Sequence, residues 1–378
     1  MVGKAEKRAK NRLIMDAKYI LVINPGATST KIAVYLDNRS VFLKSIRHEC
    51  GELDAFNSIS DQLDYRLKLV LSEVEANHIP FDSVGVIIAR GGLIHPIESG
   101  VYEVNMAMIA DLEKGVMGEH ASNLGGLIAH SLLQKFPRAG AYIADPVVVD
   151  ELQEVARISG HPKFERISIF HALNQKSIAR TYAHSRGVEY EDLNLVVAHL
   201  GSGISVGAHQ KGRVIDVNNA LDGEGPFGPE RSGTLPSGAL ARYCLEQDIT
   251  WSEMKKMLTG EGGLYAYVGH KDAQRIEKEA REGHAEAMLL QDAMAYQISK
   301  EIGAMATVLG GEVDAILITG GIAHNPDLTG EVKRRVGFIA PVLIFPGEDE
   351  MRALAQNGSL LLSGKITARN YSLKKKRG

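Results

Sequence analysis

The chain has 378 residues, enough for two domains, and its 44% hydrophobic and 24% charged residues are typical of a globular protein. A net charge of −3 argues against a nucleic-acid partner, and no apolar run approaches the roughly 18 residues of a membrane span. Two cysteines are too few for a disulfide framework, and no apolar run of a secretory signal follows the basic N-terminus. We therefore expect a cytoplasmic protein.

The first half of the chain predicts an α/β domain after a tail at residues 1–17. Three strands, expected at 19–23, 31–35 and around Val41, form a meander joined by short turns. Apolar residues then recur at helical spacing from Leu63 to Val74. Further strands are expected at 84–89 and 141–144, with a helix near 121–136.

The second half predicts the same order of elements. Strands are expected at 193–200, 204–208 and 214–215, again as a meander. A long helical stripe runs from Leu290 to Leu309 and ends at two glycines. Buried strands at 315–319 and 342–345 and a helix at 351–362 complete the pattern.

The two meanders correspond part by part. In each, a buried strand meets a turn of small residues, at Gly26 and at Gly201, and an arginine, Arg39 or Arg213, opens the third strand. Hairpins occur in any α/β protein, but the shared turn chemistry favours a duplication, with two similar domains facing a cleft. The predicted domains are 18–147, completed by a C-terminal helix at about 351–370, and a nucleotide-binding domain at 148–350.

Three turns at strand ends are rich in small residues, namely residues 24–31, 201–203 and 320–325. Glycine lets backbone N–H groups approach an anion, and consecutive N–H groups form an anion-binding concavity. The first turn adds hydroxyl groups and the cation of Lys31. No G-x-x-x-x-G-K-[ST] motif is present, and the Gly201-x-Gly203 turn leads into a strand, which argues against a dinucleotide fingerprint. The three turns together indicate a polyphosphate ligand.

Two arginines and one aspartate stand where a ligand could bind. Arg90 follows a buried strand, and Arg231 lies in a segment rich in glycine and proline. Each could recognise a carboxylate or phosphate, or could pair with a nearby acid at the surface. Asp145 ends an apolar strand, where ligands of α/β sheets bind. It could serve as a metal-linked or catalytic group, or as the N-cap of a segment after Pro146.

Other polar residues leave two interpretations open. His171 and His199 lie among apolar residues, where both a core histidine and a binding histidine fit. The acidic run 348–350 after the last strand could open an exposed helix or contact magnesium. No H-E-x-x-H motif and no zinc-type Cys/His spacing is present.

At residues 21–31, 199–206, 214–227, 229–233 and 319–324 the sequence resembles the acetate/butyrate kinase family. Residues 169–175 (IFHALNQ) resemble its butyrate-type branch most closely. The resemblance runs from about Tyr19 to Leu362. It implies a duplicated α/β fold of the actin/hexokinase-like ATPase type, with ribonuclease H-like domains. It also implies the reaction butanoate + ATP = butanoyl phosphate + ADP, with Mg²⁺, in a homo-oligomer of two or more chains.

The resemblance also implies site residues. Arg90, Arg231 and Asp145 would be catalytic, with His171 and both arginines on the substrate. The residues implied to contact ATP are Ser29, Thr30, Lys31, His199, Gly201, Ser202, Gly203, Asp272, Gly320, Gly321, Ile322 and Asn325. Asn24 and Asp349 or Glu350 would be linked to the metal.

Three positions depart from the family pattern. Ala27 stands where serine is usual, and Ser202 where glycine or asparagine is usual. Gln175 stands where acetate kinases have a second histidine, which favours the butyrate-type branch. The alternatives are a kinase for propanoate, isobutanoate or acetate, or a nucleotide-sensing module without catalytic activity.

Overall fold

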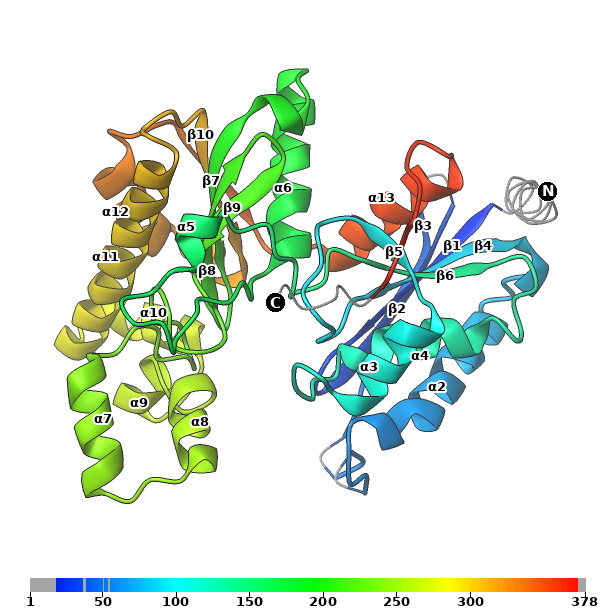
Figure 1. Cartoon of the computed structure of the whole chain (residues 1–378), viewed down its shortest axis with the longest axis horizontal. Coiled ribbons are helices and arrows are strands. Elements are labelled where there is room, and N and C mark those ends of the chain that lie inside the picture. Colours follow the sequence, from blue (N-terminus) through cyan, green and yellow to red (C-terminus); the bar gives the residue numbers. More distant parts are fainter. Residues whose placement is uncertain (1–17, 37–38, 50, 54, 373–378) are drawn as a thin grey trace. The chain divides into compact units, whose positions relative to one another are not determined.

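The computed structural model describes residues 18–36, 39–49, 51–53 and 55–372. The expected N-terminal tail, the turn at 37–38 and Cys50 lie outside the described residues. The chain divides into two compact units (Figure 1). Unit 1 comprises Met1–Val148 and Asp349–Gly378, and unit 2 comprises Val149–Glu348. No helix in the described part of the chain is long and apolar enough to span a bilayer.

Unit 1 is built on a sheet in the order β12-β5-β6-β4-β1-β2-β3. Its strands are β1 (Tyr19–Pro25), β2 (Ser29–Leu36), β3 (Arg39–Arg47), β4 (Val84–Arg90), β5 (Val101–Glu103), β6 (Gly140–Ala144) and β12 (Arg369–Asn370). Its α-helices are α2 (Leu63–Ala76), α3 (Met106–Lys114), α4 (Asn123–Leu132) and α13 (Glu350–Leu362). Helix α4 packs on β1, β4 and β6 with α2 and α3 beside it, and α13 packs on β1, β2 and β4 from the other face (Figure 1).

Unit 2 is built on a sheet in the order β11-β10-β7-β8-β9. Its strands are β7 (Asn194–Leu200), β8 (Ile204–Gln210), β9 (Arg213–Val217), β10 (Ala315–Gly320) and β11 (Val342–Pro346). Its α-helices are α5 (Glu154–Arg157), α6 (Ala172–Arg186), α7 (Ser237–Glu246), α8 (Trp251–Thr259), α9 (Leu264–Val268), α10 (Ala273–Arg281), α11 (Ala285–Val308) and α12 (Pro326–Val336). Helix α11 packs on β7, β8 and β9, and α6 packs on β7 and β10.

The two sheets share one strand pattern. In unit 1, β1-β2-β3 is an antiparallel meander, and β4 and then β6 are added in parallel beside β1. In unit 2, β7-β8-β9 is the equivalent meander, and β10 and β11 are added in parallel beside β7. The predicted duplication is therefore confirmed by the order and direction of the strands.

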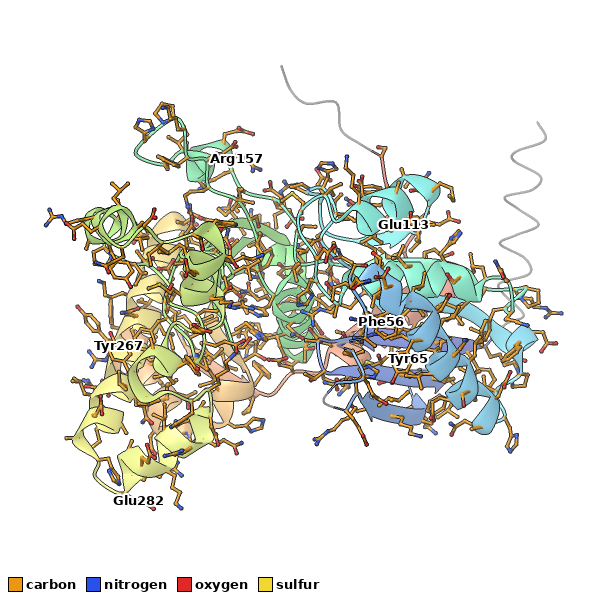
Figure 2. The ribbon with its side chains drawn as sticks, turned by 90° about the horizontal axis from the view of Figure 1, so that it is seen from below. Phe56, Tyr65, Glu113, Arg157, Tyr267 and Glu282 are labelled. Carbon is orange, nitrogen blue, oxygen red and sulfur yellow. The ribbon has the colours of Figure 1, made fainter. Side chains whose placement is uncertain are left out.

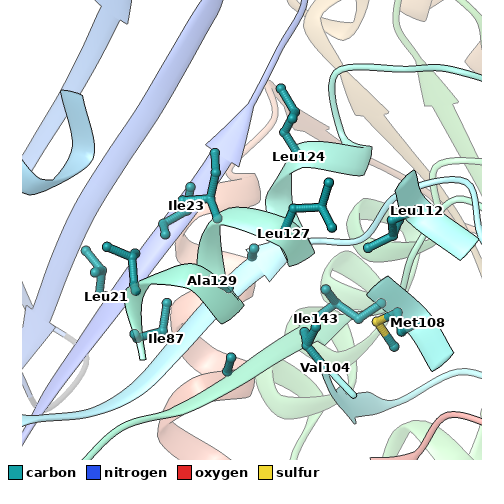
Figure 3. Close-up of a cluster of buried hydrophobic side chains, with 14 of the residues drawn as sticks. Leu21, Ile23, Ile87, Val104, Met108, Leu112, Leu124, Leu127, Ala129 and Ile143 are labelled. Carbon is teal, nitrogen blue, oxygen red and sulfur yellow. The ribbon is translucent and has the colours of Figure 1, made fainter. Parts of the chain in front are cut away.

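The core of unit 1 lies between α4 and the sheet. Leu21, Ile23 and Ile87 from the strands meet Leu124 and Leu127 from α4 (Figure 3). All five side chains are buried, and burying one such side chain contributes about 1.5–3 kcal/mol. This packing holds the carboxyl ends of β1, β4 and β6, which carry the polar residues described next.

The end of the C-terminal helix agrees with the helix expected at 351–362 and differs from the extent of about 351–370 given with the first domain. The C-terminal helix ends at Leu362 and does not continue to about residue 370. After a turn, the chain forms the short strand β12, which pairs in parallel with β5. Gly364 in that turn has φ +72°, a left-handed conformation that ends the helix without strain for glycine.

Candidate active site

In unit 1, Asn24, Arg90 and Glu350 meet at the ends of neighbouring strands. Asn24 is near the end of β1, Arg90 ends β4, and the two strands are adjacent and parallel. Glu350 is the first residue of α13. The Asn24 amide Nδ2 donates to Glu350 Oε2 at 2.6 Å, and Arg90 Nη1 lies 3.4 Å from the same oxygen. Residues separated by more than 250 positions thus form one polar cluster.

Asp145 follows β6, the next parallel strand, and its side chain is only 2% exposed. Its carboxylate Oδ1 accepts hydrogen bonds from Ser99 Oγ at 2.6 Å and from the Gly100 N–H at 2.8 Å. Asp145 has φ +36°, which is unusual for a residue other than glycine and is often found at functional sites. The N-cap interpretation is wrong, because the next helix in the described chain begins only at Glu154.

Three residues predicted to contact ATP, Ser29, Thr30 and Lys31, open strand β2, where successive side chains point to opposite faces of the sheet. Ser29 is half-buried, Lys31 is exposed, and Thr30, pointing to the other face, is fully buried. The Thr30 hydroxyl accepts from Arg66 Nη1 at 3.0 Å and lies 3.0 Å from His48 Nε2. These contacts give Thr30 a role in supporting the turn, and its expected contact with ATP stays a prediction.

Arg66 is a residue that the sequence analysis missed. It is 0% exposed, and its guanidinium donates to the carbonyl oxygens of Gly26 and Ser29 and to Gln62 Oε1. Burial lowers the pKa of Arg66 from its ordinary value. Residues 66, 70 and 74 form the buried stripe of α2. The four-residue spacing from Val70 and Val74 could therefore have predicted that Arg66 is buried.

His48 and Tyr65 continue this support toward the surface. The rings of His48 and Tyr65 pack with centroids 5.6 Å apart. Phe56 packs on Tyr65 with ring centroids 5.8 Å apart, and Figure 2 labels these two residues. Burial, and then the charge of Arg66, lowers the pKa of His48. A neutral His48 avoids a second buried charge behind the turn.

In unit 2, His171 and His199 stack with ring centroids 3.9 Å apart and an interplanar angle of 18°. His199, near the end of β7, is 1% exposed, and neither ring nitrogen has a well-aligned hydrogen-bond partner in the described part of the chain. Its Nε2 lies 3.2 Å from Glu348 Oε1. Its Nδ1 has neither a hydrogen bond nor an ion-pair contact among the described residues. A buried polar nitrogen without a partner is costly, so His199 is a candidate to bind a ligand.

The acidic run 348–350 divides among three roles. Glu348 lies beside His199, whereas Glu350 binds Asn24 in unit 1. Asp349 is the exposed N-cap of α13 and accepts from the Arg352 N–H at 3.0 Å. Among these acids, Glu350 therefore has the surroundings of a site residue, and Asp349 has those of a helix cap.

Arg231 lies over the small-residue turn after β7. Its Nη1 donates to the carbonyl oxygen of Ala220 at 2.6 Å. A Cβ at Gly203 would lie 2.1 Å from this Nη1, so a residue with a side chain cannot occupy position 203 without displacing Arg231. The glycine that was predicted to approach a phosphate therefore also makes room for the arginine.

Four of the remaining predicted nucleotide contacts line a cavity of about 330 Å³ in unit 2, whereas Gly201, Ser202 and Gly320 do not line it. Asp272, Gly321, Ile322 and Asn325 all lie on its wall. Asp272 and Asn325 also cap helices α10 and α12, because each side chain accepts from two backbone N–H groups. A larger cavity of about 550 Å³ contains none of the predicted residues, and its Arg281 and Asp327 pair with each other. The smaller cavity therefore fits the expected ligand better.

The fold of the chain resembles the folds of two kinases of known structure. It resembles an acetate kinase from Porphyromonas gingivalis with a TM-score of 0.74 and 17% identity, over 92% of this chain and 100% of that one. It resembles a propionate kinase from Francisella tularensis with a TM-score of 0.72 and 18% identity, over 90% and 98% of the chains. These similarities confirm the predicted duplicated actin/hexokinase-like ATPase fold.

The sequence comparisons identify the family. Residues 166–344 match the acetokinase family. Butyrate kinase 2 and butyrate kinase 1 of Clostridium acetobutylicum are each 49% identical over 352 residues, 93% of this chain and 99% of theirs. A probable butyrate kinase of Bacteroides thetaiotaomicron is 51% identical over the same shares. The chain belongs to the acetokinase family and is a carboxylate kinase that uses ATP, which confirms the predicted class of enzyme.

Proposed function

We propose that this enzyme transfers the γ-phosphoryl group of ATP to butanoate and forms butanoyl phosphate and ADP. The relatives named butyrate kinase, at 49–51% identity over 93% of the chain, support butanoate as the acid. The structural observation that carries the proposal is the cluster of Asn24, Arg90 and Glu350 at adjacent strand ends, close in the fold to where β6 ends at Asp145. Propanoate, isobutanoate and acetate are the alternative substrates.

The chemistry requires cations more than it requires a base. A carboxylic acid has a pKa near 4–5, so butanoate is already a nucleophile at neutral pH. Each pair of unit negative charges at about 4 Å costs around 4 kcal/mol at an effective dielectric constant of 20. We propose that Arg90 neutralises the carboxylate and that Arg231 and Lys31 neutralise phosphate oxygens. Catalysis then consists of in-line positioning and charge stabilisation.

The acidic residues of unit 1 fit magnesium as a cofactor. No group of three or more His, Cys, Asp or Glu side chains in the described chain could hold a metal alone. Mg²⁺ usually binds one or two carboxylates and completes its shell with water and substrate phosphates, so Glu350 and Asp145, with Asn24, would be the residues to hold it. When bound, Mg²⁺ would stabilise negative charge on the phosphoryl oxygens. The Ser99 and Gly100 donors would hold the Asp145 carboxylate in a fixed orientation.

Residues of unit 2 are proposed to bind the nucleotide. The cavity lined by Asp272, Ile322 and Asn325 would hold the nucleoside, and the turns at 201–203 and 320–321 would approach the phosphates. The expected homo-oligomer and the expected cytoplasmic location stay predictions. Light scattering of the purified protein would measure the mass of the oligomer.

A hydroxamate assay tests the function directly, because hydroxylamine traps acyl phosphates. Purified enzyme, ATP and Mg²⁺ are combined with straight and branched acids of two to six carbons. We expect the highest kcat/KM for butanoate and loss of product when EDTA removes the metal. A higher kcat/KM for another acid would assign that acid instead, and no acyl phosphate from any of them would refute the proposal.

A further inference from the structure

A chain of buried polar side chains runs behind His171 in unit 2. His171 Nδ1 lies 2.9 Å from Ser205 Oγ, and Gln175 Nε2 lies 2.9 Å from the same hydroxyl. On its other side, Gln175 Oε1 lies 2.9 Å from His209 Nε2, and His209 Nδ1 lies 2.7 Å from the Tyr190 hydroxyl. Gln175, Ser205 and His209 are fully buried and Tyr190 nearly so. We call these five residues the His171 relay.

A backbone carbonyl sets the direction of the hydrogen bonds in this relay. The terminal group of Gln175 lies 3.0 Å from the carbonyl oxygen of Ser205, which can only accept. The amide nitrogen of Gln175 must therefore face Ser205, and its oxygen must face His209. One of its two hydrogens goes to the Ser205 carbonyl and the other to Ser205 Oγ.

The Ser205 hydroxyl group, in turn, fixes which way the hydrogen bond to His171 runs. Its oxygen accepts from Gln175 Nε2, and the backbone N–H of His171 lies 3.5 Å away as a second, weaker donor. The hydroxyl hydrogen is then directed to His171 Nδ1, the acceptor at 2.9 Å. An imidazole that accepts at Nδ1 carries its hydrogen at Nε2.

The far end of the relay agrees with this direction. Because Gln175 Oε1 accepts, His209 must donate from Nε2. Burial, and then the charges of Lys176 and Arg180, holds the pKa of His209 well below its usual value. A neutral His209 with hydrogen at Nε2 accepts at Nδ1, where the Tyr190 hydroxyl donates. Every relay contact then has one donor and one acceptor.

We propose that Gln175 and Ser205 are positioning residues that hold His171 in the tautomer with hydrogen at Nε2. His171 would then act as a hydrogen-bond donor to an anionic oxygen of the carboxylate or the phosphoryl group, and not as a general base. This inference rests on the proposed function and on the substrate contact that the family resemblance implies for His171. It agrees with the chemistry, since an ionised acid needs no base but benefits from a donor of fixed direction.

The tautomer can be read by NMR without any activity measurement. Protein labelled with ¹⁵N-histidine is examined through the two-bond couplings of the imidazole rings, which distinguish a protonated from an unprotonated Nδ1. The His171 signals are assigned from their absence in His171→Gln. We expect Nδ1 of His171 to be unprotonated in the wild type, and we expect Ser205→Ala to yield a mixture of tautomers.

Kinetics then test the consequence. At metal sites, changing an outer partner that fixes a histidine tautomer costs about 10–100-fold, and we expect a loss of that order in kcat for Ser205→Ala, with the KM for ATP little changed. Gln175→Glu keeps the shape but removes both N–H donors, so it should shift the tautomer and lower kcat as well. The matched control is Ser299→Ala, which removes another buried hydroxyl of unit 2, one that donates to the Ala295 carbonyl in α11. This control should keep wild-type turnover.

The outcomes separate the inference from the proposed function. A protonated Nδ1 in the wild type, or an unchanged tautomer in both Ser205→Ala and Gln175→Glu, overturns the relay whatever the activity. Wild-type turnover of His171→Gln would instead remove His171 from the substrate site and so overturn the functional half of the inference. The inference is supported if Ser205→Ala and Gln175→Glu both shift the tautomer and lower kcat while Ser299→Ala does neither.

Discussion

Asp145 combines an unusual backbone conformation with buried hydrogen bonds, and both can be preserved while its charge is removed. Asn also tolerates positive φ, and its Oδ1 can accept from Ser99 and Gly100 as the carboxylate does. We therefore expect Asp145→Asn to melt like the wild type but to lose at least about a hundredfold in kcat, the size of one lost charge contact in a transition state.

Asp111→Asn is the control for this prediction. Asp111 is another buried carboxylate of unit 1, and it accepts from the Tyr371 hydroxyl, which an asparagine oxygen can also do. Its variant should keep its turnover in the hydroxamate assay. Full activity of Asp145→Asn would show that the charge at position 145 has no catalytic role.

Arg231 is expected to act mainly in the transition state. Arg231→Ala should raise the activation free energy by about 3 kcal/mol and so lower kcat roughly a hundredfold or more, with little change in the KM for ATP. Arg231→Lys should recover little, because lysine lacks the planar group that spans two acceptors. Steady-state kinetics with ATP and butanoate measure both parameters. The exposed Arg213→Ala in the same unit is the control, and an unchanged kcat for Arg231→Ala would assign Arg231 to structure.

At the scale of elements, α4 packs closely on the end of β4, which carries Arg90. A Cβ at Gly125 would lie 2.3 Å from the Arg90 carbonyl oxygen, so Gly125→Ala must move the helix or the strand. Alanine normally stabilises a helix interior by about 1 kcal/mol over glycine, but overpacking costs about 1–3 kcal/mol. We expect a net loss of stability, and a lower kcat because Arg90 moves.

Gly303 in α11 provides the opposite case. An added Cβ there meets nothing within 4 Å, so Gly303→Ala should be neutral or stabilising by up to about 1 kcal/mol. Urea unfolding of both variants decides the matter. Equal stability changes at the two positions would show that contact with β4 does not limit the residue at 125.

At the scale of the whole molecule, buried neutral histidines make stability depend on pH. The pKa of His209 is well below that of the unfolded chain, and His48 is shifted in the same direction. Below about pH 6.5 the unfolded state therefore binds more protons than the folded state. The contribution of each such histidine to the free energy of unfolding is fully present above the pKa that the histidine has in the unfolded chain. This contribution is lost as the pH falls, by up to about 1.4 kcal/mol per pH unit.

Urea titrations between pH 7.5 and 5 test this dependence. His209→Gln should flatten the slope of unfolding free energy against pH, whatever its stability at pH 7.5. The exposed His184→Gln should leave the slope unchanged. A slope in His209→Gln equal to that of the wild type would show that His209 does not remain neutral in the folded protein.

The amount that the sequence could predict differs between local and distant features. The meander strands and the long helix α11 were predicted because their periodicity and turns are local signals. Strands β5 and β12 were missed because they have only three and two residues, and β12 pairs with β5 across more than 250 positions. Helix α6 was missed because three consecutive polar residues, Asn174, Gln175 and Lys176, are buried among its apolar ones and interrupt the helical pattern.

The sequence by itself determined the class of enzyme, the duplicated order of strands and the small-residue turns, because each depends on neighbouring residues or on motifs with a fixed spacing. Only the tertiary structure decided which side chains meet. Arg90 and Glu350 come together through the neighbouring positions of β1 and β4 and the docking of α13 on the sheet. Thr30 turns inward to Arg66 because strand alternation points it to the opposite face from Ser29 and Lys31. The orientation of Gln175 follows from one backbone carbonyl on a strand that approaches α6 only in the folded chain, and no spacing along the sequence specifies that contact.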